Sequence, residues 1–264
     1  SVLNEVNGLW KQANLYPSTS EKQWRELQRR VEEKVAPLRW DYEAYLRKNP
    51  LDYRAMTTYG AFLEDIGHGN EAMVWWSFAY NLAPHYPSLL NNMAGACART
   101  GHPLPAIQLY EAAIRLEPRE AVYHFNLGNM YCLFRKETAQ LHGWKVNGVF
   151  ANALEEFRLA REQDGSNFEY AISYAKTYYG MNFPPRHQFW KEAMAAWNHC
   201  LEMKLAPDQR DFVQVHLVRV SAYLRDPIAA MNHLSEIRNH DHRQAAARML
   251  QNAFPDSFTS PLQI

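Results

Sequence analysis

The chain has 264 residues, and 28 Lys and Arg balance 28 Asp and Glu, so its formal net charge is zero. This balance argues against a nucleic-acid-binding protein, whose surface would be basic, and no apolar run reaches the ~18 residues of a membrane span. Three cysteines exclude a complete disulfide framework, and plentiful Ala, Leu, Met, Glu and Arg with scarce Val and Ile favour helices over strands.

Helices are expected to fill the first fifty residues. The apolar spacing of residues 1–16 suits a short amphipathic helix. A second helix is expected over 21–34, and Pro37 is expected to begin a third, because proline suits the first position of a helix. Two capping boxes are compatible with the start of the second helix, Ser18 with Glu21 or Ser20 with Gln23.

Residues 53–120 contain two blocks of 34 residues that agree at their small and turn positions. The matched pairs are Gly60 with Ala94, Gly67 with Gly101, Ala72 with Ala106, Trp76 with Tyr110, Ala79 with Ala113, Leu82 with Leu116 and Pro84 with Pro118. A fixed period of this length marks stacked repeats. The pattern resembles the tetratricopeptide repeat (TPR) family, in which each unit is a helix–turn–helix.

Two further blocks carry insertions between their helices. In the third block, 121–167, the insertion lies within Arg135–Val149 and is expected to form either a loop at one edge or a lengthened first helix with a packed turn. In the fourth, 168–207, the extra residues lie within Gly180–Trp190, where the Pro184-Pro185 pair predicts a rigid extended turn.

The last block, 211–239, is expected to follow a short linker, Asp208–Arg210. Asp226-Pro227 predicts a helix start, with Asp as the N-cap and Pro in the first turn. A final helix over Asp241–Ala253 is expected to cover the last repeat, and residues 255–264 read as a tail.

The resemblance implies an all-α, right-handed α-solenoid of about five TPR units with helical caps. Solenoid ends diverge from the repeat pattern because one of their faces meets water. The expected divisions are N-terminal helices and a degenerate capping repeat (1–52), the TPR array (53–239, with repeats near 53–86, 87–120, 121–167, 168–207 and 211–239) and a C-terminal capping helix and tail (240–264).

In TPR proteins the first helix of each repeat lines a concave groove that binds peptides, so the resemblance implies which residues face a ligand. Asn92 and Asn126 occupy the same slot one repeat apart, and an amide there can donate to and accept from a peptide backbone. The alternative is a polar surface residue bonded to a neighbouring helix. The candidate binding residues are Arg54, Asn91, Asn92, Arg99, Asn126, Asn129, Lys176 and Arg219. Other residues in groove slots include Glu64, Tyr179, Phe212, His216, Ala222 and Tyr223.

One branch of the family binds chaperone C-termini with a clamp of Lys, Asn and Arg residues. Basic slots of that clamp hold Thr57, Ser88 and Val122 in this sequence. The clamp is therefore incomplete, and a chaperone C-terminus is not the expected partner.

The sequence holds no nucleophile–base pair, glycine-rich phosphate loop or HExxH-type signature, so no catalytic residue, cofactor or metal is expected. His240 and His242 read as part of a capping turn rather than a metal pair. Trp75 is the candidate for an aromatic platform, since its neighbour Trp76 takes the packing slot. Buried structural thiols are expected for Cys97, Cys132 and Cys200.

The sequence thus predicts a non-enzymatic interaction scaffold that binds a peptide or a helix in its groove, without nucleic acid and without membrane insertion. Three alternatives stay open: an accessory module of a larger enzyme or secretion assembly, a self-associating solenoid, and a small-ligand site between the insertions. A soluble chain is expected, cytoplasmic or periplasmic. Because it begins at Ser1 instead of Met, its N-terminus is expected to be trimmed.

Overall fold

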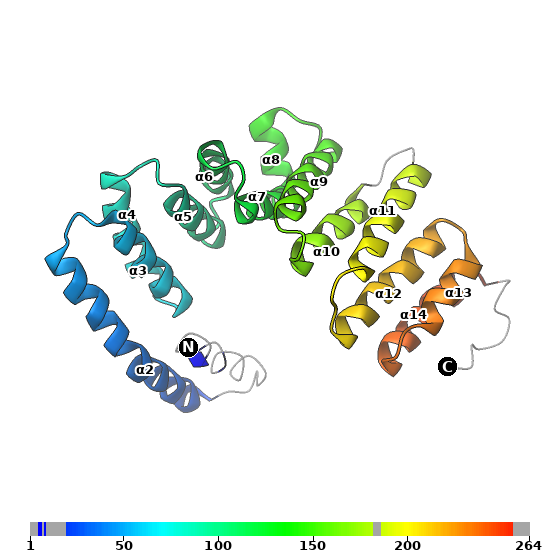
Figure 1. Cartoon of the computed structure of the whole chain (residues 1–264), viewed down its shortest axis with the longest axis horizontal. Helices are drawn as coiled ribbons and strands as arrows, with labels where there is room; N and C mark the ends of the chain where they lie inside the picture. Colours follow the sequence, from blue (N-terminus) through cyan, green and yellow to red (C-terminus); the bar gives the residue numbers. More distant parts are fainter. Residues whose placement is uncertain (1–4, 7, 9–19, 182–185, 256–264) are drawn as a thin grey trace. The chain divides into compact units, whose positions relative to one another are not determined.

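The computed structural model describes residues 5, 6, 8, 20–181 and 186–255, and every regular element in those ranges is helical (Figure 1). The all-α prediction is therefore confirmed. The chain divides into two compact units, Ser1–Pro118 and Arg119–Ile264. In the described part of the chain, no helix combines the length and the apolar character of a membrane span.

The first unit is built mainly from two helical hairpins that follow one long helix (Figure 1). In the hairpins α3 packs on α4 and α5 packs on α6. The helices are α2 (Glu21–Lys48), α3 (Tyr53–Asp65), α4 (Gly69–Leu82), α5 (Pro87–Arg99) and α6 (Pro103–Leu116).

The repeated glycines of the two blocks form the same helix-ending turn. Gly67 has φ +89° and Gly101 has φ +79°, a left-handed conformation that costs glycine little. At Gly67 the glycine N–H donates to Glu64 O (3.0 Å), and the next N–H donates to Leu63 O (2.8 Å). Together these bonds make a Schellman motif, which satisfies the last carbonyls of α3. The 34-residue period of the glycines is thus a period of turns.

The small residue at position 60 lets α3 and α4 meet closely. A Cβ built on Gly60 would lie 2.6 Å from Cδ1 of Trp76, inside van der Waals contact. Trp76 is 1% exposed, and its indole N–H donates to Thr57 O (3.0 Å). The indole therefore fills the space that a side chain at residue 60 would need, as the sequence pattern predicts.

The helix preceding the hairpins differs from the expectation. Pro37 lies inside the single helix α2, so the prediction that it begins a new helix is wrong. The capping box at the start of α2 uses Ser20 and Gln23, whose backbone N–H donates to Ser20 Oγ (3.3 Å). Proline inside a helix costs about 3 kcal/mol, but packing on either side of it offsets that cost, because Val35 and Leu46 are both buried.

The second unit is also an array of packed helices (Figure 1). It contains α7 (Ala121–Leu133), α8 (Arg135–His142), α9 (Val146–Gln163), α10 (Phe168–Thr177), the short 3₁₀ helix η1 (Tyr178–Gly180), α11 (Arg186–Leu201), α12 (Pro207–Tyr223), α13 (Pro227–Ser235) and α14 (His240–Ala253).

The insertion at 135–149 is neither a loop nor a continuation of α7. Its first part forms the separate helix α8, which ends at His142 and is followed by Gly143 in a left-handed conformation (φ +68°), and its last residues, from Val146, begin α9. Trp144 stacks on His142 with ring centroids 4.2 Å apart and meets Tyr131 of α7 edge-on at 5.7 Å. The insertion is thus held against α7 by aromatic contacts.

Two helix starts near the C-terminus follow from local chemistry. Asp226 caps α13 by accepting from Ala229 N (2.9 Å), as predicted. The expected linker at 208–210 is wrong, because α12 begins at Pro207 and those residues form its first turn. A proline at the first position of α12 explains the earlier start.

Several expectations lie wholly or mainly outside the described residues. These are most of the helix over 1–16, the Ser18–Glu21 capping box, the Pro184-Pro185 turn and the end of the tail, 256–264.

Candidate functional site

In the first unit, several predicted groove residues contact one another or a neighbouring side chain. Arg99 of α5 forms an ion pair with Glu64 of α3, so two groove slots on neighbouring repeats are joined. Asn91 Nδ2 donates to Asn92 Oδ1 (3.3 Å), and both side chains are half-buried. Arg54 is exposed and lies over the ring of the adjacent Tyr53, 5.8 Å from its centroid.

The predicted asparagine row divides between the two units. Asn92 belongs to the first unit, whereas Asn126 and Asn129 are half-buried on α7 of the second. The row therefore remains a prediction.

The last two predicted cations, Lys176 and Arg219, lie over aromatic rings of the second unit. Lys176 Nζ is 5.1 Å from the ring centroid of Phe212, and Arg219 Cζ is 5.4 Å from that of Tyr179. A cation over an aromatic face is attracted by the ring quadrupole. All four residues occupy predicted groove slots, and they come from α10, η1 and α12.

His216 lies at the centre of this group. Its ring stacks on Trp197 (4.2 Å, 3° between planes), and its Nδ1 is 3.0 Å from the hydroxyl of Tyr179. Burial, together with the charges of Arg219 and Lys176, lowers the pKa of His216 to about 3. Burial also raises the pKa of Tyr179 above its usual range. The hydrogen bond at neutral pH therefore joins two neutral rings, and the positive charge of the group belongs to Lys176 and Arg219.

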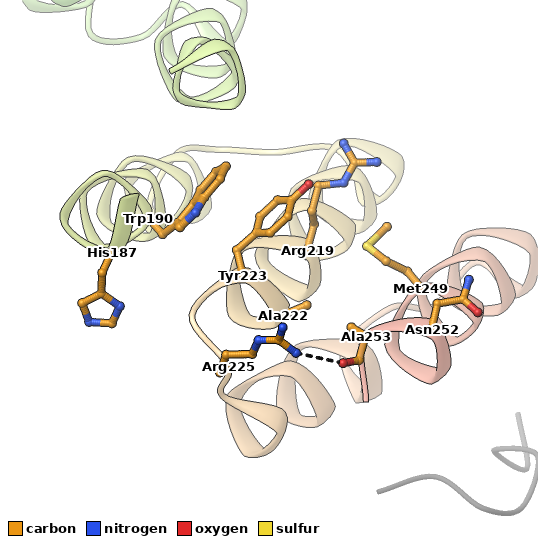
Figure 2. Close-up of a pocket in the computed structure, with 9 residues that line it drawn as sticks. All are labelled: His187, Trp190, Arg219, Ala222, Tyr223, Arg225, Met249, Asn252 and Ala253. Carbon is orange, nitrogen blue, oxygen red and sulfur yellow. Dashed lines mark hydrogen bonds between the residues drawn. The ribbon is translucent and has the colours of Figure 1, made fainter. Parts of the chain in front are cut away.

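A pocket of about 800 Å³ opens beside this group (Figure 2). Trp190 of α11 and Tyr223 of α12 stack in parallel at one side, with centroids 4.2 Å apart and 16° between their planes. Arg225, in the turn after α12, donates from Nη1 to Ala253 O at the end of α14 (3.3 Å). The lining residues are His187, Trp190, Arg219, Ala222, Tyr223, Arg225, Met249, Asn252 and Ala253.

Sequence reasoning found part of this pocket. Arg219, Ala222 and Tyr223 are predicted groove residues on α12, whereas the other lining residues come from α11, the turn after α12 and α14. No pattern in the sequence brings those elements together. A local signal could have drawn attention to Arg225, because this residue directly precedes the predicted helix start at Asp226-Pro227.

A second, more apolar pocket of about 540 Å³ lies in the first unit, between α2, α3 and α4. Trp75, the predicted aromatic platform, lines it, but its ring is half-buried and 5.3 Å from that of Tyr59. Phe78 and Leu82 line the same pocket and are exposed.

His240 and His242, the two histidines with the spacing of a possible metal pair, lie at the start of α14. Asn239 caps α14 by accepting from His242 N (3.0 Å), which places His240 and His242 in the first turn of that helix. Among the residues that the structure describes, no group of three His, Cys, Asp or Glu side chains is arranged to hold a metal ion.

Of the three cysteines, Cys200 is buried, whereas Cys97 and Cys132 are only half-buried, so complete burial was wrong for two of them. Burial raises the pKa of all three thiols, to about 11 for Cys132 and Cys200. The thiolate form, which is the nucleophile, is therefore scarce at neutral pH.

No protein-family model matches the chain, and no curated protein matches it. The fold is shared with solved structures. YrrB, described as a TPR protein with an unusual peptide-binding site, has a TM-score of 0.61 and 13% identity over 81% of this chain and 97% of that chain.

Two other solved structures share the fold. The human IFIT1 dimer with PPP-AAAA has a TM-score of 0.54 and 16% identity, covering 83% of this chain and 49% of that chain. PilF of Pseudomonas aeruginosa has a TM-score of 0.53 and 14% identity, covering 97% of this chain and 91% of that chain. The chain has the tetratricopeptide-repeat fold that its sequence predicts.

Proposed function

We propose that this chain is a non-enzymatic scaffold that binds a peptide on the groove face of its repeats, and that the binding surface includes α10, η1 and α12 of the second unit. The observation that carries the proposal is the coincidence of two independent features. The resemblance to TPR proteins assigns Lys176, Tyr179, Phe212 and Arg219 to groove slots, and in the structure the same residues pair two cations with two rings.

This surface has the composition that peptide recognition uses. Aromatic rings supply contact area at low entropic cost, and cations over them supply charge that is already positioned. The adjoining pocket adds a concave space that is lined by Tyr223 and Arg219. YrrB, which shares the fold, is described as having a peptide-binding site, and that likeness supports the proposal at the level of fold.

Peptide is favoured over nucleic acid by the charge balance of the chain. The fold itself does not separate the two, since IFIT1 has the same fold and its structure holds PPP-AAAA. The test therefore offers the full chain both ligand classes. One is an array of synthetic 12-residue peptides, and the other is a single-stranded RNA that is matched in net charge to the acidic peptides of the array.

We expect binding to peptides in preference to RNA, and loss of that binding on Tyr223→Ser, which removes a half-exposed ring from α12 (51% exposed). Tyr80→Ser is the matched control, because Tyr80 is 40% exposed on α4, the second helix of its repeat. No peptide binding, or equal loss in both variants, would contradict the proposal.

A further inference from the structure

The pocket beside α12 collects basic side chains in a chain of zero net charge. Arg219, Arg225 and His187 are among its nine lining residues, and none of the nine is acidic. Among the described residues, no carboxylate forms an ion pair with Arg219 or Arg225. The pocket therefore has positive charge without a matching negative charge in its lining.

The rest of the lining is apolar or aromatic. The stacked rings of Trp190 and Tyr223 form one side, and Met249 and Ala253 of α14 lie across from them (Figure 2). Figure 2 shows Arg219 and Arg225 toward opposite ends of this lining. This lining suits a ligand that presents an apolar surface next to an anionic group.

Arg225 occupies a backbone position that the turns at residues 67 and 101 give to glycine. Its φ is +62°, and among the described residues it is the only non-glycine residue with a positive φ. Its N–H donates to Ala222 O (3.1 Å), and the next N–H donates to Ser221 O (3.0 Å), which repeats the Schellman turn of Gly67 and Gly101. A side chain in this conformation is strained. The strained residue places its guanidinium in the lining of the pocket.

We propose that this pocket binds the side-chain carboxylate of an Asp or Glu in the peptide ligand, with a neighbouring apolar residue of the peptide packed on Trp190 and Tyr223. The inference rests on the proposed peptide-binding function and names the chemistry of the ligand. A guanidinium matches the two oxygens of a carboxylate through parallel N–H groups. Arg225 uses one N–H on Ala253 O, so its other N–H groups remain to bind the ligand.

The test uses the full chain and an array of 12-residue peptides that are acetylated at the N-terminus and amidated at the C-terminus, so that side chains supply the only carboxylates. Each acidic peptide has a matched partner with Gln for Glu and another with phosphoserine. For acidic peptides that bind, we expect the Glu→Gln change to weaken affinity about tenfold or more, as for loss of a charge-assisted hydrogen bond.

Arg219→Gln and Arg225→Gly are each expected to weaken binding of the acidic peptide and to reduce its preference for Glu over Gln. Arg225→Gly is the more informative variant, because glycine suits the left-handed backbone. Its melting temperature should stay within about 4 °C of the unaltered chain. Loss of binding without loss of stability separates a ligand contact from a structural role. Arg248→Gln is the control, since Arg248 is exposed on α14 and does not line the pocket.

The possible outcomes distinguish failure of the carboxylate site from failure of the scaffold function. Peptides that bind without preferring Glu to Gln would overturn the carboxylate site and leave the scaffold function standing. The carboxylate site would also be overturned if Arg219→Gln and Arg225→Gly kept the full preference for Glu over Gln, or if the phosphoserine peptide bound more tightly than its Glu partner. Absence of binding by every peptide would overturn the scaffold function, and the carboxylate site with it.

Discussion

The contact between Gly60 and Trp76 can be tested by adding one methyl group. In Gly60→Ala the new Cβ would lie 2.6 Å from Cδ1 and 2.9 Å from Cε2 of the indole. These atoms belong to a rigid, fully buried ring and not to the end of a flexible chain. The indole must move, and movement breaks its hydrogen bond to Thr57 O (3.0 Å).

One favourable and two unfavourable contributions set the size of the change. Ala is favoured over Gly inside a helix by about 1 kcal/mol. Overpacking typically costs 1–3 kcal/mol, and the close contact places Gly60→Ala at the upper end, about 3 kcal/mol. The unsatisfied buried indole N–H adds about 1 kcal/mol. The net effect is a loss of roughly 3 kcal/mol in the free energy of unfolding, with destabilisation winning over propensity.

The assay combines thermal unfolding by circular dichroism with hydrogen exchange over α3 and α4, because a two-unit repeat protein need not unfold in one step. Gly148→Ala is the control, since a Cβ at that helical position meets nothing within 4 Å. Adding Trp76→Tyr to Gly60→Ala recreates the Ala94 and Tyr110 combination of the next repeat. The double variant should therefore lose less than the sum of the single changes. A Gly60→Ala protein as stable as the unaltered chain, or strict additivity, would refute the reasoning.

Two further changes test the second unit. Because the pKa of His216 is lowered to about 3, only the unfolded chain takes up its proton between pH 6.5 and 3, so the free energy of unfolding falls through that window as the pH drops. The loss is about 2 kcal/mol at pH 5. His216→Gln should remove this part of the acid sensitivity, and equal losses between pH 7 and pH 5 in both proteins would count against it. Asp211 is 3% exposed and accepts from the backbone N–H groups of Arg238 (3.1 Å) and Asn239 (2.7 Å). Asp211→Ala should cost about 3 kcal/mol and speed hydrogen exchange in α14, whereas Asp211→Asn keeps one acceptor and should cost less.

The hairpins of the first unit were predictable because their signals are local. A glycine two residues past a helix end, as at Gly67, requires only its own turn. A small residue opposite a large ring, as at Gly60 and Trp76, repeats with the period of the stack. These rules hold without knowledge of any distant residue, and so the sequence reveals them.

The helix α2 shows where local rules stop. Proline usually lies in the first turn of a helix or at a break between helices. Neither rule predicts the interior position that Pro37 takes in α2. Burial of Val35 and Leu46 on either side decides the matter. The cost of the proline is local, whereas the packing that offsets it comes from tertiary structure.

The candidate site divides in the same way. The repeat pattern placed Arg219 and Tyr223 on a common face of α12, because slots within a helix follow from its period. It did not place Trp190 or Arg225 beside them, since these come from α11 and from a turn. The repeat pattern also did not decide whether Asn92 and Asn126 act together, and that row remains a prediction.

By itself, the sequence determined the helical-repeat architecture and the glycine turns of the first unit, because periodicity and backbone chemistry act over a few residues. The slots of the first helices came from the resemblance to TPR proteins. Only the tertiary structure decided that Lys176 and Arg219 lie over aromatic rings and that α11, α12 and α14 enclose a basic pocket. Those arrangements depend on side chains from separate helices meeting in space, and sequence distance does not encode such meetings.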